Sequence, residues 1–164
     1  MSEALRSAVL TSVLAGPHRG DIVAHHERLG DATVSVAASG LVPLMRWLRD
    51  AEGLDFDMLS DLCAVDHLGE TPRFEVVYHL YSLARNHRLR VKVRVTEDAP
   101  EVHSLVELWP AADWLEREVW DLYGISFRGH PNLKRLLLYE EFEGHPLRKD
   151  YPKQRRQPLI GPRD

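Results

Sequence analysis

The pattern that most constrains the fold lies between residues 74 and 96. Its second half alternates strictly between apolar and basic residues, in the order Leu89, Arg90, Val91, Lys92, Val93, Arg94 and Val95. Side chains of successive residues in a strand point to opposite faces, so this alternation predicts a strand with one apolar face. The apolar run Phe74–Leu83 precedes it, with Arg85-Asn86-His87 as the connection. The region therefore predicts an antiparallel hairpin.

Three other segments space their apolar residues like helices, and each is followed by a helix-ending residue. Residues 3–15 end at Gly16-Pro17, residues 41–51 end near Gly53, and residues 110–123 end at Gly124. Pro110 suits the first position of its helix, and Gly124 can close that helix in the left-handed conformation. The first helix is carried by Leu5, Ala8, Val9 and Val13.

Shorter patterns complete the order of elements as helix, two strands, helix, three strands, helix and tail. Residues 21–26 and 32–37 alternate around Leu29-Gly30-Asp31, which predicts a second hairpin. Residues 54–65 are ambiguous between a strand and a broken helix, and a strand is favoured in the second half. Beyond Gly124, glycine and proline recur too often for regular structure. We expect one domain over residues 1–143 and an extended arm over residues 144–164.

Composition narrows the class of protein. The single cysteine, Cys63, excludes an internal disulfide and a four-cysteine iron–sulfur cluster. No apolar run approaches the roughly 18 residues of a membrane span, and the N-terminus lacks the pattern of a secretory signal, so we expect a cytosolic chain. The arm holds six basic and two acidic residues, a net +4, which leaves −8 for residues 1–143. A basic arm on an acidic body is expected to lie on an acidic partner.

Several candidate chemistries are weak. The basic strand face formed by Arg88, Arg90, Lys92 and Arg94 could grip phosphates, but the chain is acidic overall and lacks a nucleic-acid motif, so we expect a solvated or partner-facing strand. The histidine pairs His25-His26 and His130/His145 lack metal-ligand spacing, and the second pair sits in turn-like Gly-His-Pro tripeptides. Cys63 is expected to be a buried small apolar residue.

The charged run from Glu116 to Asp121 first suggests an active site. On a helix, Asp113, Arg117 and Asp121 share one stripe, which predicts a ladder of ion pairs on a solvated or interface-facing ridge. Glu118 falls at the edge of the apolar stripe, where a buried carboxylate must be paired or protonated. Arg135 and Arg148 are its candidate partners, and a structural clamp is favoured over a catalytic carboxylate.

These residues resemble a known signature. Its positions are Glu116, Arg117, Glu118, Asp121, His130 and Lys134, followed by Leu136-Leu137. A second matching run, residues 144–152, contributes His145, Arg148, Lys149, Asp150 and Tyr151. The pattern is similar to that of the thirty-kilodalton subunit, called the C subunit in bacteria, of proton-translocating NADH:quinone oxidoreductase, which is respiratory complex I.

The resemblance implies an α+β fold with two layers, in which helices lie on one face of a mixed, largely antiparallel sheet, plus the extended arm. It implies a structural and assembly subunit that binds no cofactor itself, within a complex that carries FMN, iron–sulfur clusters and quinone. The expected partners are the quinone-site subunit, the cluster-bearing subunit beside it and the ferredoxin-like subunit. The complex would hold the chain at the cytoplasmic face of the cell membrane, or at the matrix face of the inner membrane in a mitochondrion.

Three alternatives remain open at the level of the sequence. Membrane-bound hydrogenases and coenzyme F420 dehydrogenases have an equivalent subunit that shares the Glu-Arg-Glu core. A stand-alone hydrolase could use Glu118 with His130 or His145. A regulatory module unconnected to any membrane complex is the third. No catalytic, metal-binding or cofactor-binding residue is predicted in this chain.

Overall fold

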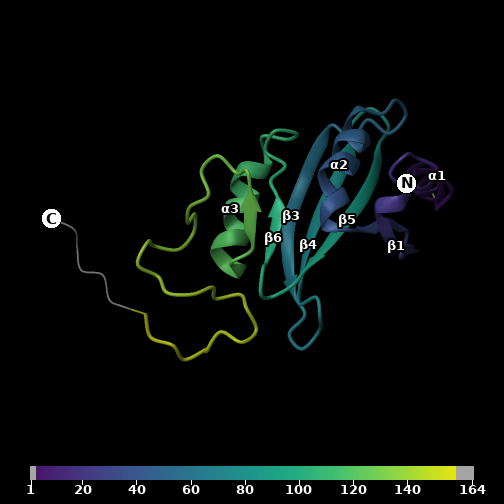
Figure 1. Ribbon diagram of the computed structural model, residues 1–164. Helices are drawn as coiled ribbons and strands as arrows, with labels where there is room; N and C mark the ends of the chain where they lie inside the picture. Colours follow the sequence, from purple (N-terminus) through teal and green to yellow (C-terminus); the bar gives the residue numbers. More distant parts are fainter. Residues whose placement is uncertain (1–2, 158–164) are drawn as a thin grey trace.

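The fold is known from a computed structural model that describes residues 3–157, with side chains from residue 8 onward. Its main sheet has five strands, which are β1 (Ile22–Arg28), β2 (Asp31–Val36), β3 (Met58–Asp66), β4 (Phe74–Ser82) and β5 (His87–Val95). Three α-helices accompany it, α1 (Glu3–Leu14), α2 (Leu41–Asp50) and α3 (Ala112–Tyr123), with short 3₁₀ turns at Arg19–Asp21 and Ala38–Gly40. Figure 1 shows α3 standing beside the sheet, next to β3 and away from α1.

The sheet order is β1-β2-β5-β4-β3, and only the β2–β5 contact is parallel. The apolar residues of the alternating strand, such as Val91 and Val93, are fully buried, while Arg90 and Lys92 lie on the opposite, open face. Helices α1 and α2 cover the apolar face through residues such as Val13 and Leu44. The predicted fold class, a two-layer α+β domain with a mixed, largely antiparallel sheet, is confirmed.

Both predicted hairpins are present. Strands β4 and β5 pair antiparallel from Phe74↔Val95 to Ser82↔His87, so β5 begins two residues earlier than its alternation indicates. Strands β1 and β2 turn through Leu29 and Gly30, which have φ angles of 55° and 78°. Two consecutive positive φ values are the requirement of a tight hairpin turn whose twist matches the strands. The ambiguous segment 54–65 forms a strand in its second half, as expected.

One feature is absent from the sequence prediction. Strands β6 (Glu101–His103) and β7 (Ser126–Arg128) form a separate parallel pair on either side of α3. Parallel strands need a crossover connection, and α3 supplies it. Each strand has only three residues, too few for an alternation to be visible. The pair buries Val102 and Phe127 and so holds α3 at the edge of the main sheet.

After β7 the described chain, residues 129–157, contains neither helix nor strand. It loops out from α3 and returns toward the lower end of β3 and β4 in Figure 1. The last part of the predicted arm, residues 158–164, lies outside the described residues, as does the side chain of Leu5. No helix within residues 3–157 is long and apolar enough to span a bilayer.

Candidate functional site around helix α3

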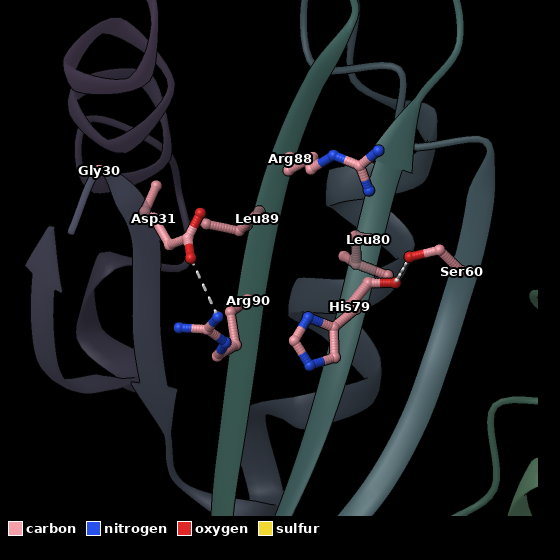
Figure 2. Close-up of a pocket in the computed structure, with 9 residues that line it drawn as sticks. Gly30, Asp31, Ser60, His79, Leu80, Arg88, Leu89 and Arg90 are labelled. Carbon is pink, nitrogen blue, oxygen red and sulfur yellow. Dashed lines mark hydrogen bonds and ion pairs between the residues drawn. The ribbon is translucent and has the colours of Figure 1, made fainter. Parts of the chain in front are cut away.

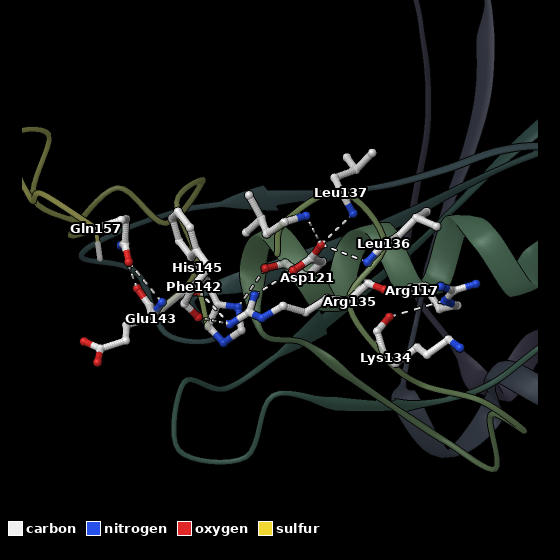
Figure 3. A network of polar contacts seen from close by, with 12 residues as sticks. Arg117, Asp121, Lys134, Arg135, Leu136, Leu137, Phe142, Glu143, His145 and Gln157 are labelled. Atoms are coloured by element: carbon white, nitrogen blue, oxygen red, sulfur yellow. Dashed lines mark hydrogen bonds and ion pairs between the residues drawn. The ribbon is translucent and has the colours of Figure 1, made fainter. Parts of the chain in front are cut away.

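Asp121 is the centre of the site. It lies on the buried side of α3 with no exposed surface, and its carboxylate accepts four hydrogen bonds. Oδ2 accepts the backbone N–H groups of Leu136, Leu137 and Leu138 at 3.0, 2.9 and 2.9 Å. Oδ1 accepts the Arg135 guanidinium at 2.6 Å. One side chain thereby fixes three consecutive peptide groups of a segment that has no regular structure of its own (Figure 3).

The ionisation of Asp121 follows from these contacts. Burial alone would raise the pKa of its carboxyl, and it is the largest single influence. The hydrogen bonds from Leu138, Arg135, Leu137 and Leu136 together outweigh burial and hold the pKa below its usual range. The group is therefore a charged carboxylate at neutral pH, and it needs its donors to stay buried.

Arg135 and Arg117 extend the clamp. Arg135 also donates to the carbonyl of Phe142 at 2.6 Å, so it ties residue 142 back to α3. Arg117 donates to the carbonyls of Lys134 and Arg135 at 3.3 and 3.2 Å. Residues 134–142 are thus held by side chains that project from one helix and from the segment itself.

Two predictions about the charged run are wrong. The stripe of Asp113, Arg117 and Asp121 is not a solvated or interface-facing ridge of ion pairs. The segment 134–138 buries Asp121, and the Arg117 guanidinium donates to backbone carbonyls of that segment. Glu118 is not the clamped carboxylate: it is half-buried, and no ion pair joins it to Arg135 or Arg148 within the described residues. The error came from a helical wheel, which contains no information about which face a distant segment will cover.

Glu116, the first acid of the signature, is the other buried carboxyl of α3. It has no exposed surface and accepts hydrogen bonds from the Ser104 hydroxyl at 2.6 Å and the Leu105 N–H at 2.7 Å. Burial raises its pKa to about 7 despite these two donors, and the charge of Asp113 adds to the rise. Glu116 joins α3 to the loop after β6. Nearby, the Tyr78 hydroxyl is buried, and its pKa is raised by burial and by Glu116.

The arm completes the C-terminus of α3. The last carbonyls of a helix lack partners within the helix. Here the carbonyl of Asp121 accepts His145 Nδ1 at 2.9 Å, that of Leu122 accepts the Leu147 N–H at 3.1 Å, and that of Tyr123 accepts Arg148 Nε at 2.6 Å. A carbonyl only accepts, so Nδ1 of His145 carries a proton. The positive charge of Arg148 near the C-terminus of α3 also interacts favourably with the helix dipole.

Gly124 makes this approach possible. Its φ of 75° confirms the predicted left-handed end of α3. A Cβ atom at this position would lie 2.6 Å from the His145 ring and 2.9 Å from the Arg148 guanidinium. The glycine therefore serves both the turn and the close contact of the arm.

A second anchor holds the arm at the ends of strands β3 and β4, around Arg73. Arg73, at 4% exposed, pairs with Asp66 Oδ2 at 2.8 Å, Asp150 Oδ1 at 2.7 Å and Glu97 Oε1 at 2.6 Å. The N–H of Lys149 donates to the same Asp66 carboxylate at 2.7 Å. Sequence reasoning named Lys149 and Asp150 but missed Arg73 and Asp66. The sequence does contain a signal for this ion pair: Asp66 is the last residue of strand β3, and Arg73 directly precedes strand β4, its antiparallel neighbour.

The remaining predicted residues are peripheral to these anchors. The His130 ring lies 3.1 Å from the Asp113 carbonyl oxygen, and the exposed Lys134 contributes its own carbonyl to Arg117. Tyr151 stacks on Phe142 with ring centroids 6.1 Å apart. The rings of His130 and His145 thus both face backbone carbonyls of α3, which leaves neither arranged with Glu118 as a hydrolase pair.

The basic face of β5 is largely neutralised by its own neighbours. Arg90 pairs with Asp31 at 3.3 Å, and Lys92 pairs with Glu75 at 2.9 Å. Arg94 contacts Glu75 and Glu70. A pocket of about 160 Å³ opens on this face beside Arg90, His79 and Ser60 (Figure 2). Three of the four basic side chains of β5 thus have acidic partners within the chain.

Fold and site together define a small α+β domain whose charged signature holds an irregular C-terminal segment in place. Residues 34–157 match the family described as respiratory-chain NADH dehydrogenase, 30 Kd subunit, and the chain belongs to this family. It is 54% identical over 123 residues to the C subunit of the NADH-quinone oxidoreductase of Roseiflexus castenholzii, a match covering 75% of this chain and 71% of the relative.

Two solved structures resemble the fold. One is the trypsin-resistant fragment (1-134) of Nqo5, with a TM-score of 0.67 and 32% identity, covering 79% of this chain and 99% of the fragment. The other belongs to the membrane-bound sulfane sulfur reductase, an archaeal respiratory membrane complex, with a TM-score of 0.72 over 90% of this chain and 86% of that one. Its identity is 22%, so it bears on the fold alone.

Proposed function

We propose that this chain is a cofactor-free structural and assembly subunit of the hydrophilic arm of an NADH:quinone oxidoreductase. The complex would pass electrons from NADH through FMN and iron–sulfur clusters to quinone and couple this transfer to proton translocation. The proposed partners are the quinone-site subunit, the cluster-bearing subunit beside it and the ferredoxin-like subunit. The proposed location is the cytoplasmic face of the membrane, held there through the complex.

The observation that carries a structural role is the use made of the signature. The Asp121 carboxylate, Arg117, Arg135 and the rings of His130 and His145 all contact backbone groups of the same chain. Catalytic acids and bases instead point their reactive atoms at a site that substrate can enter. Signature residues that bind the backbone of their own chain are suited to fixing the shape of the surface that this backbone forms.

That surface is suited to partner proteins. On α3 and the segment after it, Trp114, Leu137 and Leu147 are 65%, 61% and 48% exposed, which is unusual for large apolar side chains. Beyond its anchors at His145 and Asp150, the arm carries exposed Lys153, Arg155 and Arg156. Apolar side chains with a basic rim support docking on protein surfaces that carry acidic residues.

The matching subunit of a hydrogenase-type or F420 dehydrogenase complex is the second candidate. The likeness to the archaeal respiratory complex favours it only as far as the fold. The 54% identity to the C subunit of an NADH-quinone oxidoreductase favours the first candidate.

The decisive experiment is affinity purification of the tagged full chain from membranes, with identification of the co-eluting subunits. Quinone-site and cluster-bearing subunits of an NADH:quinone oxidoreductase are expected, and hydrogenase subunits would support the second candidate. A chain recovered alone from the cytosolic fraction would refute both. A tagged chain that lacks residues 153–164 should co-elute with smaller amounts of these subunits. The control variant Glu52→Gln, an exposed change after α2, should co-elute with the same amounts as the wild type.

Assembly and turnover can be separated in the same preparation. Asp121→Asn is expected to lower the amount of assembled complex and to leave turnover per assembled complex unchanged. The substitution loosens residues 136–138, which belong to the proposed docking surface, and it removes no proposed cofactor contact. Normal abundance with reduced turnover would point to a direct catalytic part for this residue.

A further inference from the structure

Three side chains of types that can ligate a metal meet on strands β3 and β4, on the open face of the sheet. In the antiparallel β3–β4 pair, Asp61 lies directly opposite His79, and Cys63 follows two residues along β3. The period of two in a strand places all three side chains on one face. Figure 2 shows His79 on β4 between Arg90 of β5 and Ser60 of β3.

Their ligand atoms are close enough for one ion. A carboxylate oxygen of Asp61, the sulfur of Cys63 and a ring nitrogen of His79 all lie within 4.8 Å of one another. Ligands at ~2.0–2.3 Å from a tetrahedral zinc are roughly 3.5 Å apart. Side-chain rotations on two firmly paired strands can close this difference without moving the backbone.

The donor atoms are also available. Asp61 Oδ1 accepts the N–H of Leu62 at 2.9 Å, which orients the carboxylate and leaves Oδ2 for a metal. Within the described part of the chain, no hydrogen bond is found for the His79 ring or the Cys63 thiol. Cys63 is exposed, contrary to the expectation of a buried small residue, so an ion can reach it from solvent.

The charges favour a divalent ion with sulfur affinity. A bound metal would displace the thiol proton of Cys63 to solvent, because the thiolate is the form that ligates. One thiolate and one carboxylate then balance a 2+ charge, and the nearby Arg90 is already paired with Asp31.

We propose that Asp61, Cys63 and His79 form a binding site for zinc or a similar divalent metal, with the fourth position open to water. A sulfur, an imidazole and a carboxylate are the ligand types that zinc takes in proteins. The pattern escapes sequence inspection because its members are spread over two strands, sixteen residues apart from Cys63 to His79. The site is independent of the proposed function, and its test needs only the full chain.

The test is a titration of the reduced full chain with Co²⁺ as a spectroscopic probe, followed by Zn²⁺. One equivalent of Co²⁺ should give a thiolate-to-cobalt charge-transfer band, and Zn²⁺ should displace it. Cys63→Ser should abolish the band, and His79→Gln should weaken metal binding by more than about tenfold. The matched control is His25→Gln on β1, which should change neither.

Thermal unfolding gives a second readout. Zn²⁺ should raise the unfolding midpoint of the wild-type chain and of His25→Gln, and the rise should disappear in Cys63→Ser. Circular dichroism verifies that each variant is folded, and Asp61→Asn, at an exposed position, provides a further ligand variant. The proposal is overturned if Co²⁺ gives no thiolate band, or if Cys63→Ser binds Zn²⁺ as tightly as the wild type.

Discussion

Replacing Asp121 with asparagine is the sharpest test of the clamp. The substitution keeps the size of the side chain but removes the charge, and its amide presents one acceptor oxygen where the carboxylate presents two. At least one of the Leu136, Leu137 and Leu138 N–H groups, or the Arg135 guanidinium, then loses its partner. Breaking a buried ion pair by removing one member costs about 3–5 kcal/mol of stability. We expect Asp121→Asn to fall within this range.

Urea unfolding measures the cost, and hydrogen exchange locates it. The amides of residues 136–138 should lose protection in Asp121→Asn, while those of the β4–β5 hairpin should keep it. Glu118→Gln, on the same helix but half-buried and outside the clamp, is the control and should change stability by less than about 0.5 kcal/mol. A loss below about 1 kcal/mol in Asp121→Asn with unchanged exchange at 136–138 would refute the assignment.

The same residue predicts an acid response. The pKa of Asp121 is lower in the folded chain than the value of 3.8 expected when unfolded. A depressed carboxyl pKa contributes stability above the unfolded value, and that contribution is lost as pH falls below about 4. Wild type should therefore lose stability over this acid range more steeply than Asp121→Asn. Equal slopes in urea titrations from pH 5 to pH 3 would contradict the prediction.

The other buried charges predict further outcomes. Burial raises the pKa of Glu116 to about 7 from an ordinary value of 4.5, so the free energy of unfolding should decrease between pH 4.5 and pH 7, by on the order of 3 kcal/mol. Urea unfolding at pH 5 and pH 8 should show this decrease in the wild type and a smaller one in Glu116→Gln. Arg73→Gln should cost about 3–5 kcal/mol, and a double-mutant cycle with Asp150→Asn should show coupling above about 0.5 kcal/mol; zero coupling would mean that the arm is not anchored there. Deleting residues 144–164 should lower the thermal midpoint, because it removes the caps of α3, whereas deleting residues 153–164 should leave the midpoint within a few degrees; equal midpoints for the two truncations would argue against the caps.

The sequence predicts the main sheet well because its information is local. Alternation from Leu89 to Val95 and the turn at Leu29-Gly30 depend on neighbouring residues only, and both appear as expected. Gly124 ends its helix for a similarly local reason. The short β6–β7 pair escapes because three residues carry no visible period.

The site was predicted less well because its contacts are long-range. The helical wheel places Glu118 at an apolar edge and Asp121 in a solvated or interface-facing stripe, yet the structure buries Asp121 under a segment fifteen to seventeen residues further along the chain. Arg73 meets Asp150 across a separation of 77 residues. No periodicity relates residues that are so far apart, and only their charge suggested a partner.

Apolar side chains could not replace the buried acids Asp121 and Asp66, for a physical reason. Residues 129–157 have no helix or strand, so their backbone N–H groups lack the usual partners, and buried groups of this kind must be satisfied. Asp121 accepts three such groups, and Asp66 accepts a fourth from Lys149. An apolar side chain would leave each donor unpaired, at about 1–3 kcal/mol apiece. Buried ion pairs add little net stability compared with well-packed apolar groups, but their geometry is directional. The acids therefore select one path for the segment, and a fixed path is what a docking surface without secondary structure requires.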